Sequence, residues 1–130
     1  MKIMVGYDRS NVAKEALEIA TKHAKAFDAK VHVLTSLARS PEMEREDIQK
    51  AEHELKNVKI HFEESGISCT THATVSSQSP GEDLVQFALE NDIGEIVIGV
   101  KRRSKVGKLL FGSNAQYVIL QAPCPVVAVK

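Results

Sequence analysis

Short contiguous apolar runs alternate along the chain with longer stretches in which apolar residues recur every three or four positions. Contiguous runs predict strands covered on both faces, and recurrence at three and four predicts helices packed through one side. The predicted strands are 2–7, 31–37, 68–75, 95–98 and 125–129. The predicted helices run from about 10 to 27, from 40 to the glycine at 66, from 79, and from 113 to 121.

Local signals set the starts of these helices. Ser40 and Pro41 together predict the opening of the long second helix, with serine at the cap and proline in the first turn. The segment 79–82 reads as a capping box, also with proline at the first helical position. In the first helix we expect Phe27 to close the apolar stripe that faces the core.

The order of elements is β-α-β-α-β-α-β-α-β, which predicts a single α/β domain over residues 1–130. Its parallel sheet is doubly wound, with helices on both faces and right-handed crossovers. The first and fourth strands are the most apolar and belong at the centre, whereas 68–75 alternates in polarity and belongs at an edge. The simplest strand order is 3-2-1-4-5, with the switch point between strands one and four.

Ligands of open α/β sheets bind beyond the carboxyl ends of the strands at the switch point. Asp8 follows the first strand and Gly99 follows the fourth, and the second strand ends beside them at Thr35 and Ser36. This placement predicts a binding site there.

Composition narrows the class of protein. Lysine plus arginine equals aspartate plus glutamate at 17 each, and a net charge of zero argues against a general nucleic-acid binder. The two cysteines form no CxxC pair, and no apolar run approaches the ~20 residues of a membrane span. The N-terminus does not read as a signal peptide, so we expect a soluble cytoplasmic domain.

The segment from Gly99 to Ser113 has the strongest chemical signal. It holds five basic residues between Lys101 and Lys108, no acid, and three glycines, and it leads into a helix. Helix-start N–H groups, glycines and cations together predict a phosphate site. The alternative is structural: Ser113 caps the helix with Gln116 completing the box, and the basic residues form a solvated face.

Four segments resemble the universal stress protein family: 3–10, 96–99, 111–115 and 124–129. The ATP-binding branch of that family carries Gly, two residues, Gly, nine residues, then Gly followed by Ser or Thr. Gly99, Gly112 and Ser113 match this motif in spacing, and Arg102 replaces its second glycine. The Arg102 side chain would either crowd the phosphates or contact them, and the neighbouring basic residues favour contact.

The resemblance implies a fold like that of the adenine nucleotide alpha hydrolases and a site for ATP accompanied by Mg²⁺. Asp8 would lie near the adenine and ribose, although as an alternative it would only cap the turn toward Ser10. The residues implied to contact the nucleotide are Asp8, Ser36 through its backbone, Ile98, Gly99, Arg102, Gly112 and Ser113.

Other chemistry finds little support. There is no Walker pattern, the five histidines share no metal-binding spacing, and Cys69 and Cys124 read as small buried hydrophobes. We therefore expect no catalytic residues and no resident metal site. Slow ATP hydrolysis is the weakest of the functional hypotheses.

The last strand, Val126–Val129, is an apolar edge that invites pairing with its twin, so we expect a homodimer. The favoured interpretation is a dimeric ATP-binding protein of stress response. The alternative is a scaffold dimer whose pocket Arg102 closes. We expect neither nucleic-acid nor membrane partners.

Overall fold

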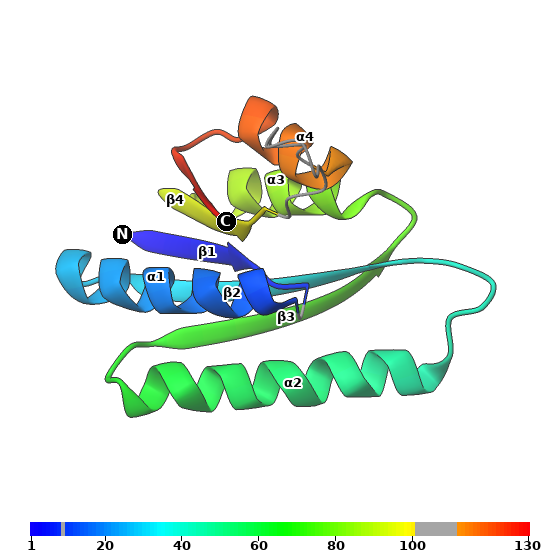
Figure 1. The fold of residues 1–130 in the computed structure, drawn as a ribbon, viewed down its shortest axis with the longest axis horizontal. Helices are drawn as coiled ribbons and strands as arrows, with labels where there is room; N and C mark the ends of the chain where they lie inside the picture. Colours follow the sequence, from blue (N-terminus) through cyan, green and yellow to red (C-terminus); the bar gives the residue numbers. More distant parts are fainter. Residues whose placement is uncertain (9, 101–111) are drawn as a thin grey trace.

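The structure, a computed structural model, describes residues 1–8, 10–100 and 112–130. Strands and helices alternate as the pattern predicts. They are β1 (Lys2–Gly6), α1 (Asn11–Phe27), β2 (Lys30–Ala38), α2 (Arg45–Glu64), β3 (Cys69–Ser76), α3 (Pro80–Glu90), β4 (Glu95–Gly99), α4 (Ser113–Gln121) and β5 (Val126–Val129) (Figure 1). Within the described ranges, no helix has both the length and the apolar character that crossing a bilayer requires.

The five strands form one parallel sheet in the order β3-β2-β1-β4-β5, which confirms the predicted topology. The chain winds outward from β1 to β3 and then returns to the other side of β1. The change of direction lies between β1 and β4, where Gly6 stands opposite Ile98. Because all strands point the same way, their carboxyl ends form one edge of the sheet, at which loops from distant parts of the chain meet.

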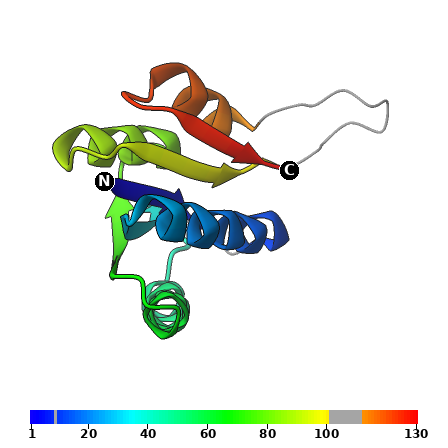
Figure 2. The ribbon, with the colours of Figure 1, turned by 90° about the vertical axis from the view of Figure 1, so that its left-hand side faces the viewer.

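Helices cover both faces of the sheet, with α1 and α2 on one side and α3 and α4 on the other (Figure 2). Alternation along β1 divides the core accordingly. Ile3 and Val5 pack with the α1 and α2 cluster, while Met4 packs with the α3 and α4 cluster, and all three are fully buried. Each such side chain contributes roughly 1.5–3 kcal/mol to folding. The contiguous apolar run of β1 therefore follows from its two covered faces.

The long helix α2 begins at Arg45, so the prediction that Ser40 and Pro41 open it was wrong. The Ser40 carbonyl accepts from the Met43 amide at 3.1 Å, which makes 40–43 a turn with proline in its second position. The fixed φ of proline suits that position as well as a first helical turn. The helix start is held instead by Asp47, whose Oδ2 accepts from the Glu44 amide at 3.0 Å.

Phe27 does not face the core, contrary to the prediction, since 52% of it is exposed. It is the last residue of α1, and the chain turns back toward the sheet through Asp28 in the left-handed region at φ 51°. Ala29, which follows, enters the core in its place. The spacing of apolar residues could not show that Phe27 is exposed, because Phe27 keeps the helical spacing although α1 ends at this residue.

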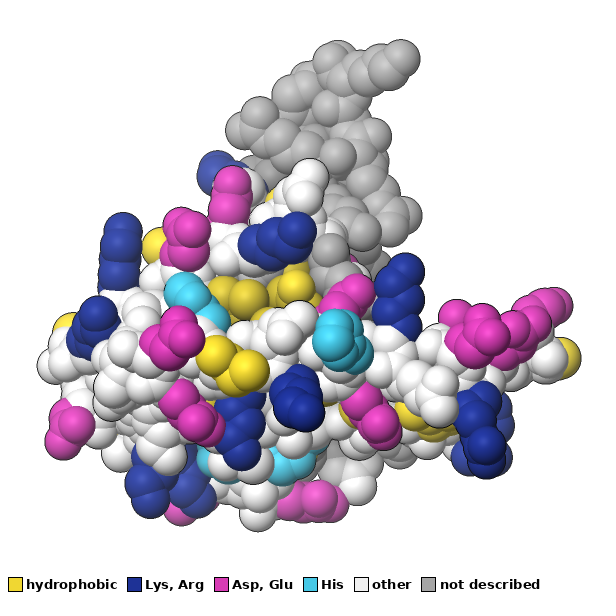
Figure 3. All heavy atoms as spheres, turned by 90° about the horizontal axis from the view of Figure 1, so that it is seen from below, with side chains coloured by type: hydrophobic (Ala, Val, Ile, Leu, Met, Phe, Trp, Pro, Cys, Tyr) yellow, Lys and Arg dark blue, Asp and Glu magenta, His cyan; other side chains and the backbone are white. Residues whose placement is uncertain are grey.

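The face formed by α1 and α2 is not closed completely. Figure 3 shows a hollow with an apolar floor there, bordered by charged residues and histidines. Its volume is about 370 Å³, and it is lined by Tyr7, Lys14, Leu17, Glu54, Asn57, Val58 and His61.

Candidate functional site

A second, smaller cavity of about 160 Å³ opens at the carboxyl edge of the sheet, on the side of α3 and α4. Four of the site residues predicted from the sequence line it: Asp8, Ser36, Ile98 and Gly99. They come from the ends of three strands that meet at the switch point. Residues far apart in the sequence therefore share one pocket because parallel strands end together.

The start of α4 lies beside this cavity. Gly112 is the N-cap and Ser113 the first helical residue, and the two residues after them, Asn114 and Ala115, line the pocket. The alternative in which Ser113 caps the helix was wrong, because the cap position belongs to Gly112, at φ −61° and ψ 156°. Arg102 and the basic run 101–108 fall outside the described residues.

Asp8 occupies a defined position at the cavity rim. Its Oδ1 accepts from the Ser10 amide at 3.0 Å, so the cap interpretation of this residue is confirmed. The preceding residue is fixed from both sides, because the Tyr7 amide donates to the Leu34 carbonyl at 3.0 Å and the buried Thr35 Oγ1 donates to the Tyr7 carbonyl at 2.8 Å. These bonds orient the carboxylate while leaving it part of the pocket lining.

The cavity walls are apolar. Leu34 and Ile98 from the sheet face Leu84 from α3 and Val118 from α4. Gly6 keeps the space between them open, since a Cβ there would lie 3.1 Å from a methyl of Leu84 and 3.2 Å from one of Ile98. The arrangement suits a flat, largely apolar group held between the sheet and α3.

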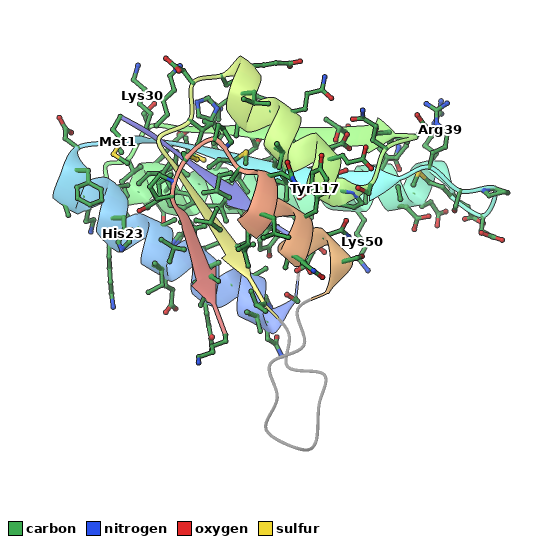
Figure 4. All side chains as sticks on the ribbon, turned by 90° about the horizontal axis from the view of Figure 1, so that it is seen from above. Met1, His23, Lys30, Arg39, Lys50 and Tyr117 are labelled. Atoms are coloured by element: carbon green, nitrogen blue, oxygen red, sulfur yellow. The ribbon has the colours of Figure 1, made fainter. Side chains whose placement is uncertain are left out.

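The helices that form the outer wall are fastened to each other. The Gly81 amide in the first turn of α3 donates to Asn114 Oδ1 at 3.0 Å. A Cβ on Gly81 would lie 2.9 Å from the Asn114 carbonyl oxygen, so the two backbones approach closely. Tyr117 lies on the side of α4 that faces α3 (Figure 4). Sequence reasoning missed this junction, although a glycine inside a capping box was a usable signal.

One polar pair joins the sheet to α3 at the rim. Ser36 Oγ donates to Asp83 Oδ2 at 2.6 Å. Because 47 positions separate the two residues, no spacing in the sequence could reveal this bond. Sequence reasoning therefore missed Asp83, which does not line the cavity but hydrogen-bonds to the lining residue Ser36.

The histidines and cysteines lie elsewhere. Nδ1 of His32 and Nε2 of His72 are 3.4 Å apart in nearly parallel rings, and burial lowers the pKa of both imidazoles. Burial raises the pKa of Cys69 to about 11, and burial together with the Glu95 carboxylate raises the pKa of Cys124. A raised thiol pKa opposes thiolate chemistry. Nowhere in the described ranges do three or more metal-ligating side chains gather.

Comparison with known proteins accounts for this architecture. The sequence pattern of the universal stress protein family matches residues 1–130. This chain belongs to that family. It is 33% identical to a universal stress protein of Methanocaldococcus jannaschii over 143 aligned positions, which cover 99% of this chain and 81% of the relative.

Two solved structures of universal stress proteins from Archaeoglobus fulgidus superpose closely on the chain. One, at 37% identity, gives a TM-score of 0.88 and covers all of this chain and 98% of its own. The other, described as a complex with dAMP, gives 0.84 at 33% identity with the same coverage. The fold is therefore that of the universal stress proteins, as the resemblance implied.

Proposed function

We propose that this universal stress protein binds ATP, accompanied by Mg²⁺, in the cavity at the switch point and acts in stress response. The observation that carries the proposal is the meeting of Asp8, Ser36, Ile98 and Gly99 in one cavity beside the start of α4. The dAMP complex of the Archaeoglobus fulgidus relative supports an adenine nucleotide as the ligand class.

The size of the cavity indicates how the nucleotide is arranged. Pockets that enclose a whole drug-sized ligand measure about 300–1,000 Å³, and this one measures about 160 Å³. The base occupies the apolar slot, and the sugar and phosphates extend out of it. The Asp8 carboxylate at the rim accepts from ribose hydroxyls. The phosphates lie toward Gly99 and the first turn of α4, where N–H groups without helical acceptors and the positive helix end favour anions.

The first experiment measures ATP binding by calorimetry and by thermal shift with Mg²⁺. Ligand at 100 times its dissociation constant stabilises the fold by about 2.7 kcal/mol. Gly112→Leu adds bulk at the phosphate end, and its φ of −61° is open to any residue, so the variant keeps the fold and loses the shift. Gly94→Leu adds the same bulk just before β4, at the opposite end of the strand, and keeps the shift. Equal ATP affinity in Gly112→Leu and wild type would refute this placement of the phosphates.

Arg102→Gly separates ATP binding from the scaffold alternative. This substitution restores the second glycine of the motif. If the guanidinium contacts the phosphates, the variant binds ATP more weakly. If wild type does not bind millimolar ATP and Arg102→Gly does, the arginine closes the pocket, and the scaffold function is favoured.

The proposed assembly is a homodimer through β5. This strand lies at the edge of the sheet. Its neighbouring carbonyls at Pro125 and Val129 accept from the amides of Ile96 in β4 and of Val100 just after it. Alternation therefore directs the backbone polar groups of Val126 and Ala128 away from the sheet, available to a second copy. On the neighbouring α4, Ile119 and Leu120 are exposed, and apolar surface of this kind is favourable to bury.

Light scattering after size exclusion tests the dimer. Ala128→Pro removes an outward amide while leaving the bonds to β4, so the variant elutes as a folded monomer. Wild type that remains monomeric at high micromolar concentration would exclude the dimer. We also propose that binding, not turnover, is the activity. Phosphate release that exceeds the Gly112→Leu background would instead establish a hydrolase.

A further inference from the structure

Two histidines from adjacent strands meet on the face of the sheet that α3 covers. In the register of β2 and β3, His32 lies opposite Thr70 and His72 lies opposite Leu34, so the two histidines are diagonal neighbours on one face. Leu34 packs with the α3 and α4 cluster, which places both imidazoles on that side. Because 40 positions separate His32 from His72, no spacing along the chain could reveal the pair.

The distance between the two rings suits a shared metal ion better than a hydrogen bond. His32 Nδ1 lies 3.4 Å from His72 Nε2. Hydrogen bonds with a nitrogen donor mostly measure about 2.7–3.2 Å. Two nitrogens that each lie about 2.0–2.1 Å from a tetrahedral zinc ion are about 3.3–3.4 Å apart. The observed separation therefore equals that of two ligands of one ion.

The rings approach each other through these two nitrogens. Their centroids are 5.6 Å apart and their planes differ by 20°, so the nitrogens at 3.4 Å are the facing edges of the two rings. The χ2 torsion of histidine is broad, and a small rotation of each ring directs both lone pairs to one point beside the pair. Phe87 of α3 packs against both rings, with centroids 4.7 Å from His72 and 5.7 Å from His32, and limits their other movements.

Access and charge set the kind of ion that the pair can hold. Both imidazoles are partly exposed, so an ion and its water ligands reach them from solvent. Burial lowers the pKa of each, which keeps both rings neutral at pH 7.5, the form that binds a metal. Lys2 and Lys30 are cations whose charge acts on His32, and Lys2 Nζ donates to the Asn91 carbonyl at 3.2 Å. Because these cations repel another positive charge, the ion must form direct bonds to imidazole nitrogen.

We propose that His32 and His72 form a binding site for a divalent transition metal ion of the zinc type, with water molecules as the remaining ligands. Imidazole nitrogen suits zinc, copper and nickel, whereas magnesium and calcium prefer oxygen. Within the described ranges no third metal-ligating side chain joins the pair, so binding is weaker than at a site with three or four protein ligands. Neither histidine lines the nucleotide cavity, and the inference does not depend on the proposed function.

Calorimetry with ZnCl₂ on the chain without an affinity tag, at pH 7.5 and without nucleotide, tests the site. Wild type binds zinc at this pair, and excess Mg²⁺ does not displace it. His32→Gln and His72→Gln each remove one of the two protein ligands and lower the affinity by at least about tenfold, the loss that even an outer-shell change causes. Nitrogen NMR of the imidazoles identifies the ligands, because zinc shifts the signals of His32 Nδ1 and His72 Nε2.

His61→Gln is the matched control. It makes the same substitution at an exposed histidine of α2 and retains the zinc affinity of wild type. Thermal melts without metal confirm that all variants fold, and zinc raises the melting temperature of wild type and of His61→Gln more than that of His72→Gln. If wild type shows no binding up to millimolar ZnCl₂, or if His72→Gln binds zinc as tightly as wild type, the inference is wrong.

Discussion

Replacing Gly81 by alanine introduces a methyl group where α3 and α4 approach most closely. The added Cβ would lie 2.9 Å from the carbonyl oxygen of Asn114 and 3.2 Å from its Cα. Both atoms belong to the backbone of α4, so no rotamer change relieves the contact. The helices must separate by a few tenths of an ångström, and the bond from the Gly81 amide to Asn114 Oδ1 lengthens.

The magnitude follows from three opposing effects. Alanine in place of a helical glycine stabilises by at most about 1 kcal/mol. Overpacking a tight contact costs about 1–3 kcal/mol, and weakening the hydrogen bond costs about 1 kcal/mol more. The net expectation is a loss of about 2 kcal/mol in the free energy of unfolding. For a chain of 130 residues this lowers the melting temperature by roughly 6–10 °C.

Chemical and thermal denaturation measure this loss, and Gly94→Ala provides the comparison. The nearest atoms to a Cβ on Gly94 are Cε and Cγ of Met1 at 3.4 Å, an ordinary contact with a flexible side chain. The same substitution there is neutral or stabilises by about 0.5 kcal/mol, because it restricts the unfolded chain. If Gly81→Ala proves as stable as Gly94→Ala, the two helices are not in the tight contact described, and the reasoning fails.

Three further predictions concern side chains outside the cavity. Burial lowers the pKa of His32 and His72 below the ordinary 6.5, so near that pH the unfolded chain binds more protons than the folded protein. The free energy of unfolding is therefore retained above about pH 6.5 and falls as the pH drops from there toward the folded pKa values. Urea titrations at a series of pH values measure this fall, and His72→Gln makes it less steep. Cys69, with its pKa raised to about 11, resists alkylation at pH 8 in the folded protein and reacts on unfolding; rapid labelling of the native chain would contradict this. His23→Ala lowers the free energy of unfolding by roughly 1–3 kcal/mol, because His23 Nδ1 lies 2.8 Å from a carboxylate oxygen of the buried Glu95; His23→Ala with Glu95→Gln recovers part of the loss, and no recovery would argue against the pairing.

Much of the fold could be predicted because its signals are local. Contiguous apolar runs predicted the buried strands. The alternation of polar and apolar residues over 68–75 correctly predicted that β3 lies at an edge. Boundaries were harder where one residue type serves two structures. Pro41 fits a turn and a first helical turn equally well, and only the competing cap at Glu44 and Asp47 decides between them.

Only the part of the site that follows from the strand topology could be predicted. Parallel strands that end together brought Asp8, Ser36 and Gly99 to one cavity without any knowledge of side-chain contacts. The bond between Ser36 and Asp83 depends on how α3 is set against β2, which is a tertiary result that no spacing along the chain encodes. The same limit hid the junction between Gly81 and Asn114.

Substitutions in the cavity walls and at the cavity rim affect different properties of the protein. Leu34, Leu84 and Ile98 belong to the core as well as to the slot, so shortening one of them removes burial worth several kcal/mol together with any contact to a ligand. Asp8 and Ser36 lie outside the apolar clusters and form hydrogen bonds to the Ser10 amide and to Asp83. Losing such a bond costs about 1 kcal/mol, less than shortening a wall residue. Variants at the rim, rather than in the walls, therefore show most directly what the pocket binds.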